Sequence, residues 1–203
     1  MFSFRKMIFS VTAAAAVALW LCGCADPVVF SEVFQQKTGE DIYTRYNLWY
    51  ADPQEVSCLN IQSGSFIPIG TAIEPLSTGS FPERINFRVK SSGKVFSIRY
   101  DEAYRLCTMR EFIRTTFTTV NPVPSIPAKT EREKKIRARI LRGEVVPGMT
   151  RKDVELAYGP PPAIRTPDKR NESWIYWRTP TRQIRVIFRD DVVRNVLDLN
   201  QDL

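Results

Sequence analysis

The first 23 residues constrain this 203-residue chain most, because they decide how much of it is available to fold. Arg5 and Lys6 are the only charged residues there, and the run that follows, residues 7–21, is almost entirely apolar. This run is shorter than the roughly 20 residues that cross a bilayer, but it has the length of the apolar part of an export signal. We therefore predict that residues 1–23 are a cleavable signal peptide.

The signal ends in a short motif, Leu21-Cys22-Gly23-Cys24. It resembles the lipobox of bacterial lipoproteins, in which an aliphatic, a variable and a small residue precede the cysteine that accepts diacylglycerol before cleavage. The resemblance implies that Cys24 becomes the lipidated first residue of the mature chain, and two or three acyl chains are enough for firm membrane binding. An ordinary signal peptide and an uncleaved anchor are the alternatives.

The residue after Cys24 bears on sorting. By resemblance to enterobacterial sorting rules, an Asp in that place favours retention in the inner membrane, and this chain has Ala25 there. We therefore expect a lipid-anchored protein of the outer membrane that faces the periplasm. The outer leaflet of the inner membrane is the alternative location.

The composition narrows the function of the mature part. Of 29 basic and 22 acidic residues, two basic ones lie in the signal, which leaves 27 minus 22, a net charge of +5. This charge is mild and the arginines are dispersed, so we expect no binding to nucleic acid. The chain has no histidine, which removes His-based triads, the commonest general base and the usual zinc ligand.

An enzyme is a weaker hypothesis for the same chain. Carboxylate pairs such as Asp190-Asp191 fit turns and helix caps better than an acid and base pair. No cluster of Cys, Asp and Glu has the spacing of metal ligands, and nothing in the sequence indicates a cofactor. We therefore expect no enzymatic activity, no metal site and no cofactor.

Two cysteines, Cys58 and Cys107, remain in the mature part after Cys24. In an oxidising compartment they can form a disulfide, and closing a loop of about 50 residues would stabilise the fold by roughly 4 kcal/mol before strain is subtracted. The alternative is two separate buried thiols that behave as small apolar side chains. A catalytic thiol is disfavoured, because no histidine can activate it.

After a lipidated tether, residues 24–40, residues 41–120 have the pattern of a β-rich domain. Residues 42–50 are rich in aromatic and β-branched side chains, and residues 85–89 and 95–100 flank a Ser-Ser-Gly-Lys connection typical of a hairpin. We expect a strongly bent sheet or a small SH3-like barrel. Its aromatic side chains either fill a small core, which is the commoner use, or line a binding groove.

A proline-rich segment separates this domain from the last one. Residues 108–118 predict a short helix or a final strand, and three prolines then fall within residues 121–127. Proline lacks a backbone donor and disfavours helix. We therefore predict a linker over residues 121–129.

The last domain, residues 130–203, begins with two clear helix starts. Thr130 and Thr150 each stand three residues before an acidic residue, which is the spacing of a capping box, and each helix is followed by a glycine, Gly143 or Gly159. Three strand-like runs come next, at residues 173–178, 182–189 and 192–197. The whole chain is therefore predicted to be α+β, with the β-rich domain followed by a small α-α-β-β-β domain.

The last domain also contains a longer motif. A Gly-Met-Thr-x-x-x-Val-x-x-x-x-Gly-x-Pro pattern begins at Gly148, and a Trp-x-Tyr strand at 174–176 and a Val-x-Phe strand at 186–188 follow it. These features resemble the SmpA/OmlA family of small outer-membrane lipoproteins, the family of BamE. The resemblance covers the carboxyl-terminal part only. It implies an α-α-β-β-β domain without enzymatic activity that supports the assembly of outer-membrane proteins.

The leading hypothesis is a non-catalytic envelope lipoprotein that binds a partner protein, in or beside outer-membrane assembly. A lipoprotein that binds peptidoglycan or another ligand through its β-rich domain is the alternative, and the oligomeric state stays open. The predicted contact set combines arginine and tryptophan, which are enriched in interaction hot spots. It consists of Arg165, Trp177, Arg178, Arg182 and Arg185.

Overall fold

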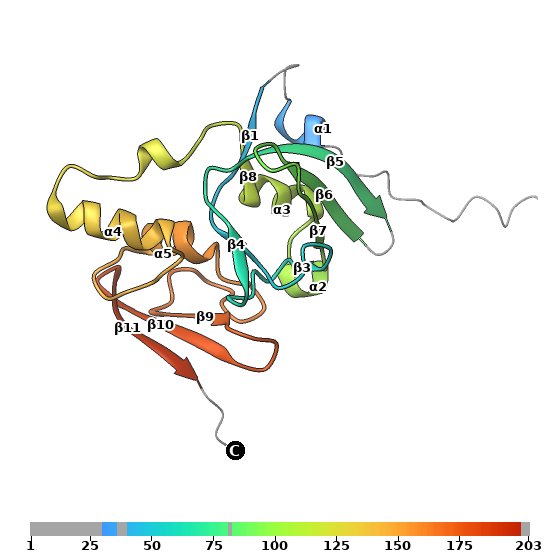
Figure 1. Ribbon diagram of the computed structural model, residues 1–203. Helices are drawn as coiled ribbons and strands as arrows, with labels where there is room; N and C mark the ends of the chain where they lie inside the picture. The colour runs from blue at the N-terminus through green and yellow to red at the C-terminus, as the bar shows by residue number, and fades with distance from the viewer. Residues whose placement is uncertain (1–29, 36–39, 81–82, 200–203) are drawn as a thin grey trace, which may run out of the picture.

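The computed structural model describes residues 30–35, 40–80 and 83–199 (Figure 1). In these ranges the chain forms five α-helices, one short 3-10 helix and 11 strands, which confirms the predicted mixed α+β class. No helix in the described ranges is long and apolar enough to cross a membrane. The predicted signal peptide and Cys24 lie outside the described residues.

A six-stranded sheet forms the β-rich region, in the spatial order β3-β7-β6-β5-β1-β8. Neighbouring strands are antiparallel except for β3 and β7, which are parallel. The strands are β1 (Ile42–Thr44), β3 (Val56–Ser57), β5 (Ala72–Ser80), β6 (Glu83–Val89), β7 (Val95–Arg99) and β8 (Phe117–Thr118). A separate pair, β2 (Leu48–Tyr50) and β4 (Ser65–Ile67), and the helices α1 (Phe30–Phe34), α2 (Glu102–Arg105) and α3 (Met109–Thr116) complete the region.

The predicted hairpin is confirmed, since β6 and β7 pair in antiparallel register. Ile85, Phe87 and Val89 alternate with less buried residues along β6, so one face of the strand packs into the core. The ring of Phe87 lies 5.6 Å from that of Phe96 and 5.4 Å from that of Phe117. The stretch predicted as a helix or a final strand forms both, because α3 runs directly into β8.

One predicted strand, residues 42–50, is divided between two sheets. The chain leaves the large sheet after Thr44 and re-enters an extended conformation only at Leu48. The side chain of Asn47, which lies between, is fully buried, and its Oδ1 accepts a hydrogen bond from the backbone N–H of Ile69 at 2.9 Å. Because a buried amide must find partners, the backbone bends to bring Asn47 to them.

Helix α1 falls within the stretch 24–40 that the sequence leaves as a tether. Phe30 is only 2 % exposed and Val33 5 % exposed. The Phe30 ring packs edge-on against Phe117 at 5.2 Å. A helix of five residues is not stable by its own propensity, so these contacts hold it. The packed part of the chain therefore includes α1, inside the stretch predicted as a tether.

The carboxyl-terminal region has its elements in the order α4 (Glu131–Leu141), α5 (Arg151–Tyr158), β9 (Ser173–Trp177), β10 (Gln183–Arg189) and β11 (Val192–Leu199). The three strands form an antiparallel sheet in the order β11-β10-β9. Both predicted capping boxes are present, at Thr130 and Thr150. Asp190 and Asp191 have positive φ of 53° and 60°, which confirms a tight two-residue hairpin turn.

Helices α4 and α5 lie on one side of this sheet (Figure 1). The strand residues that face them are at most 1 % exposed: Trp174, Tyr176, Ile184, Val186, Phe188 and Val193. The proline-rich segment 121–129, which contains the short helix η1 (Val123–Ser125), packs on the same core, because Ile126 is 3 % exposed.

Amide side chains of the β-rich region join the two regions at the carboxyl ends of α4 and α5. Asn47 Nδ2 donates to the carbonyl oxygens of Ile140 (2.7 Å) and Ala157 (3.2 Å). Asn60 Nδ2 donates to that of Tyr158 at 2.7 Å. The last carbonyls of a helix lack partners inside it, so the β-rich region supplies the donors that α4 and α5 need.

Two glycines allow the regions to approach this closely. A Cβ at Gly143 would lie 2.7 Å from Trp49 Cζ2, and a Cβ at Gly159 would lie 2.7 Å from Tyr46 Cε2. Both glycines also have positive φ, 65° and 79°, a conformation that favours glycine where a helix ends.

Candidate functional site

The carboxyl-terminal sheet has a second face, which points away from α4 and α5. Strand register places Ile175, Arg185 and Leu197 side by side across the three strands. In Figure 1 no described helix or strand lies on this side of the sheet. We call it the outer face and define it by Ile175, Trp177, Arg185, Ile187, Leu197 and Leu199.

The outer face is accessible to solvent and combines apolar side chains with the polar Ser173, Gln183 and Asn195, which the same register places on it. Leu197 is 42 % exposed, Arg185 is exposed, and Ile175 and Ile187 are half-buried. Single exposed apolar residues are normal on a protein surface, but a contiguous apolar patch with polar residues around it is typical of an interaction site. This patch crosses all three strands, so it has the features of a binding surface.

Arg165 and Trp177 come together at one edge of the outer face. The Arg165 guanidinium lies over the Trp177 ring, 5.7 Å from its centroid. Thr166 holds the loop in place, because its Oγ1 accepts a hydrogen bond from the backbone N–H of Ile175 at 3.0 Å. A cation over a tryptophan face is attracted by the ring. The structure therefore joins two of the predicted contact residues into one unit.

Arg178 and Arg182 belong to a different cluster. Arg178 Nε lies 3.2 Å and Arg182 Nη2 3.5 Å from the same carboxylate oxygen of Asp198. These contacts tie the turn between β9 and β10 to the end of β11. Of the five predicted contact residues, therefore, Trp177 and Arg185 lie on the outer face, Arg165 lies at its edge, and the other two lie around Asp198.

Four apolar residues of the outer face were missed by sequence reasoning: Ile175, Ile187, Leu197 and Leu199. The alternation of the predicted strands contained the signal, because side chains next to a buried position in a strand point to the opposite face. Ile175 stands between the buried Trp174 and Tyr176, and Ile187 stands between the buried Val186 and Phe188.

The far end of the outer face is hollowed. A depression of about 540 Å³ is lined by Glu172, Ile187, Phe188, Arg189 and Arg194. The register of β10 and β11 shifts between Ile187 and Phe188, and such a bulge re-aims side chains locally. Arg189 and Arg194 are both exposed, so the end of the outer face is positively charged.

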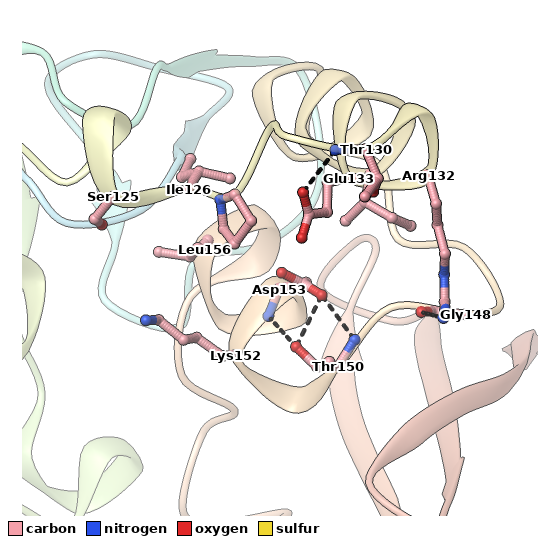
Figure 2. Close-up of a pocket in the computed structure, with 12 residues that line it drawn as sticks. Ser125, Ile126, Thr130, Arg132, Glu133, Gly148, Thr150, Lys152, Asp153 and Leu156 are labelled. Carbon is pink, nitrogen blue, oxygen red and sulfur yellow. Dashed lines mark hydrogen bonds between the residues drawn. The ribbon is translucent and has the colours of Figure 1, made fainter.

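A second candidate is a groove of about 640 Å³ between residues 125–127 and the first turns of α4 and α5 (Figure 2). Ile126, Ile136 and Leu156 form its apolar walls. Both helix starts in the groove are closed by their own carboxylates, Glu133 and Asp153. The capping boxes therefore occupy two amides at each helix start and place a carboxylate there, which disfavours an anion, so the groove has fewer features of a binding site than the outer face.

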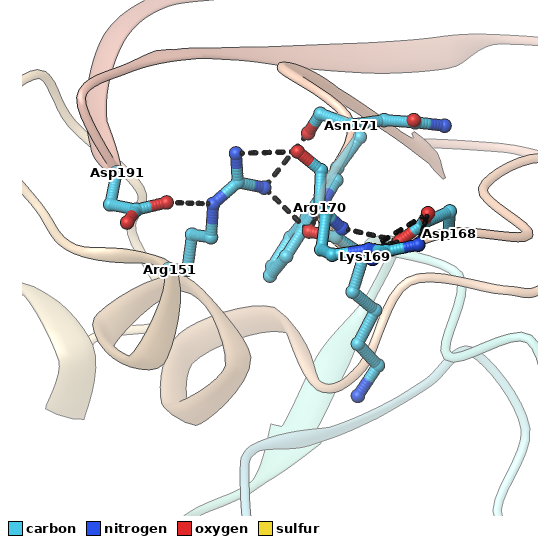
Figure 3. Close-up of polar contacts among 7 residues, drawn as sticks. Arg151, Asp168, Lys169, Arg170, Asn171 and Asp191 are labelled. Carbon is cyan, nitrogen blue, oxygen red and sulfur yellow. Dashed lines mark hydrogen bonds and ion pairs between the residues drawn. The ribbon is translucent and has the colours of Figure 1, made fainter.

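Arg151 holds the loop that leads into β9 (Figure 3). Its Nε donates to Asp191 Oδ1 at 2.7 Å, and its Nη1 donates to the carbonyl oxygens of Lys169 (2.7 Å) and Asn171 (2.8 Å). The guanidinium also lies 4.4 Å from the centroid of Phe188. All of these contacts are internal, so Arg151 is a structural residue that joins α5, the loop and the hairpin turn.

The same loop contains a carboxyl group, that of Asp168, whose pKa lies well below its ordinary value. Hydrogen bonds from the Arg170 side chain and backbone lower the pKa of Asp168 to about 2. Asp168 Oδ2 lies 2.7 Å from Arg170 Nη2. The pair is exposed, and these contacts lie within the loop itself.

Cys58 and Cys107 both pack in the core of the β-rich region and are free thiols in this structure. Cys58 is buried and Cys107 is half-buried. Burial raises the pKa of both thiols, while the nearby Arg105 guanidinium acts in the opposite direction. Since thiols rather than thiolates are then present near neutral pH, they react slowly. The disulfide stays a prediction.

The aromatic residues of the β-rich region that were considered for a ligand groove fill its core. Phe87, Phe96, Phe112 and Phe117 are each at most 3 % exposed. Among the residues that the structure describes, no group of three or more His, Cys, Asp and Glu is placed to hold a metal ion.

The outer face is therefore the strongest candidate site, on its geometry alone. Comparison of the chain with models of known protein families, with curated proteins and with solved structures finds no match.

Proposed function

We propose that this chain is a non-catalytic lipoprotein of the cell envelope that binds a partner protein through the outer face. One observation carries the proposal. The sheet has one face whose apolar side chains are buried against α4 and α5, and an opposite, accessible face on which Ile175, Ile187 and Leu197 lie beside Arg185. Binding would remove this apolar area from water, which is favourable at about 25 cal/mol per Å².

The chemistry of the face indicates the chemistry of the partner. Leu197 and Ile175 provide an apolar centre beside Arg185, and the Arg165–Trp177 unit lies at one edge. Arg189 and Arg194 add positive charge at the other end. The complementary surface is apolar with carboxylates around it. Such charges speed association and select the partner more than they raise affinity.

The rest of the proposal concerns location and family. Cys24 carries the lipid anchor, and the outer membrane, on its periplasmic side, is the proposed location. We also propose an SmpA/OmlA-like carboxyl-terminal domain of α-α-β-β-β form with a role in outer-membrane protein assembly. The order of α4, α5, β9, β10 and β11 supports that assignment, together with the Gly-Met-Thr motif at residues 148–150.

The partner-binding proposal is tested with two matched double variants. Arg185→Ser with Leu197→Ser alters the outer face, and Arg178→Ser with Arg182→Ser alters the cluster around Asp198. We expect the first pair to abolish recovery of envelope proteins cross-linked to the chain in intact cells, and the second pair to preserve it. All four side chains are solvent-facing, so stability should change by only about 0.5 kcal/mol per site, which thermal unfolding checks. Equal recovery with both pairs at unchanged stability would contradict the proposal.

The anchor is tested separately. Intact-mass measurement of the mature chain should show acyl groups on Cys24, and Cys24→Ala should leave a chain without them. Cys22→Ala is the matched control and should be processed normally. A mature chain without acyl groups would exclude the lipid anchor and would leave the partner-binding proposal untouched.

A further inference from the structure

The attached position of α1 limits how far the folded body can move from a lipid on Cys24. Phe30 is buried against Phe117, and Glu32 of the same helix lies 3.5 Å from Arg110 of α3. Helix α1 is therefore fixed to the β-rich region by packing and by an ion pair. In the sequence, residues 24–29 separate the proposed anchor from this helix.

Six residues are a short connection. A fully extended chain spans at most about 3.3–3.6 Å per residue, so this segment reaches roughly 20 Å. If the whole stretch 24–40 were free, the reach would be nearly three times as long, and any face of the body could meet the bilayer. With the shorter connection, the end of the molecule that contains α1 must stay beside the membrane.

The outer face lies at the opposite end of the molecule. In Figure 1 α1 and the beginning of β1 are at the top, and the β9-β10-β11 sheet is at the bottom. The two regions are joined rigidly by the buried amides of Asn47 and Asn60. The orientation of α1 relative to the membrane therefore determines the side toward which the outer face is turned.

The surface beside α1 suits contact with a bilayer. Val120 is 73 % exposed, and the pairing of Tyr43 with Thr118 places it next to the beginning of β1. Arg45 and Arg114 are exposed, and the Arg45 guanidinium donates to the carbonyl oxygen of Phe117, whose ring packs on Phe30 of α1. In the headgroup layer of a bilayer, an apolar side chain can contact the acyl chains while neighbouring arginines contact the lipid phosphates.

We propose that the α1 end, with Val120 at its tip, lies against the bilayer and that the outer face is directed away from that bilayer. This inference rests on the lipid anchor of the proposed function. It assigns the occupant of the α1 end as a lipid surface, and it places the partner of the outer face on the side remote from the membrane to which the chain is anchored.

The test is photo-cross-linking of the full acylated protein to lipid. The protein is reconstituted into vesicles of phosphatidylethanolamine and phosphatidylglycerol that contain a phosphatidylcholine with a diazirine near its headgroup, and cross-linked peptides are identified by mass spectrometry. Because the connection reaches roughly 20 Å, we expect about tenfold more cross-links in residues 30–35 and 109–120 than in residues 173–199. A similar frequency in both sets would overturn the proposal.

A variant with a longer connection is the matched control. Inserting about 12 Gly and Ser residues between Asp26 and Pro27 triples the reach, and cross-links should then spread to other faces. An unchanged pattern would show that the connection does not orient the body and would contradict the proposal. Acylation is checked by intact mass in each sample, and partner recovery does not enter the readout. A chain that still captures its partner but cross-links through the sheet would therefore overturn the orientation alone.

Discussion

The two regions of this molecule have equally buried cores but are assembled from different kinds of contact. In the carboxyl-terminal region each strand pairs with the next one along the chain, β9 with β10 and β10 with β11. In the β-rich region β1 pairs with β8 from the far end of the region, and β3 pairs with β7. Distant pairing requires closure of long loops, which is slow and costs entropy. The carboxyl-terminal region is therefore locally specified, whereas the β-rich region depends on the whole chain.

The prediction with the largest expected effect tests whether the core of the carboxyl-terminal region can be destabilised without loss of the β-rich region. Trp174→Ala should lower the free energy of unfolding by about 3–5 kcal/mol, because it removes a large buried side chain from a well-packed core. Urea unfolding measures the loss, and hydrogen exchange should show that amides of β6 and β7 keep their protection. Trp177→Ala, on the outer face, is the matched control and should cost about 1 kcal/mol or less. Equal losses for the two variants would contradict the assignment of inner and outer faces.

The second prediction concerns the coupling between the regions. Asn47→Ala should cost about 2–4 kcal/mol, since it leaves buried carbonyls of α4 and α5 without donors. We also expect the unaltered chain to unfold in one transition and the variant in two, as followed by fluorescence and by hydrogen exchange. Asn195→Ala, an exposed amide on β11, is the control, with an expected change within about 0.5 kcal/mol. A single transition at unchanged midpoint would show that the amides do not couple the regions.

The third prediction tests the loop before β9. Arg151→Lys keeps the charge but cannot present the planar fork of donors that contacts Asp191 and the loop carbonyls. We expect a loss of about 1–2 kcal/mol in thermal unfolding, with faster hydrogen exchange at Lys169 and Asn171. Lys152→Ala, the exposed neighbour on the same helix, should change little. If both variants behave alike, Arg151 does not hold the loop.

The prediction with the smallest expected effect concerns the pKa of Asp168. Arg170→Ala should raise the pKa of Asp168 from about 2 toward its ordinary value of 3.8, because the guanidinium and its hydrogen bonds favour the carboxylate. In the unaltered chain the lowered pKa stabilises the folded state above pH 3.8, and this contribution is lost as the pH falls from 3.8 toward 2. Carboxyl carbon chemical shifts measure both values by NMR. An unchanged pKa in the variant would show that the Arg170 side chain does not cause the shift.

The parts of the fold that depend on neighbouring residues could be predicted from the sequence, and the parts that depend on distant residues could not. Thr130, Thr150 and the Asp190-Asp191 turn depend on neighbours within a few residues, so local rules identified them correctly. The division of residues 42–50 into two strands depends on partners of Asn47 that lie 93 and 110 residues away. Helices α1 and α2 are too short to be stable without tertiary packing, so they could not be predicted from local sequence, although Asp101 caps the start of α2.

The candidate site was only partly predictable for a similar reason. Trp177 and Arg165 were selected on residue type, and the structure brings them together. Arg178 and Arg182 were grouped with them, but both contact Asp198, which meets them only when β11 closes the sheet. The apolar half of the outer face was readable from strand alternation and was missed because only the buried half of each strand was used.

The two glycines at the ends of α4 and α5 have a consequence for how such a chain can change over generations. Gly143 and Gly159 end their helices and also make room for Trp49 and Tyr46 of the other region. A replacement at either position would disturb a helix end and the seam between the regions at once. We therefore expect that a carboxyl-terminal region taken from another chain can replace this one only if it brings both glycines.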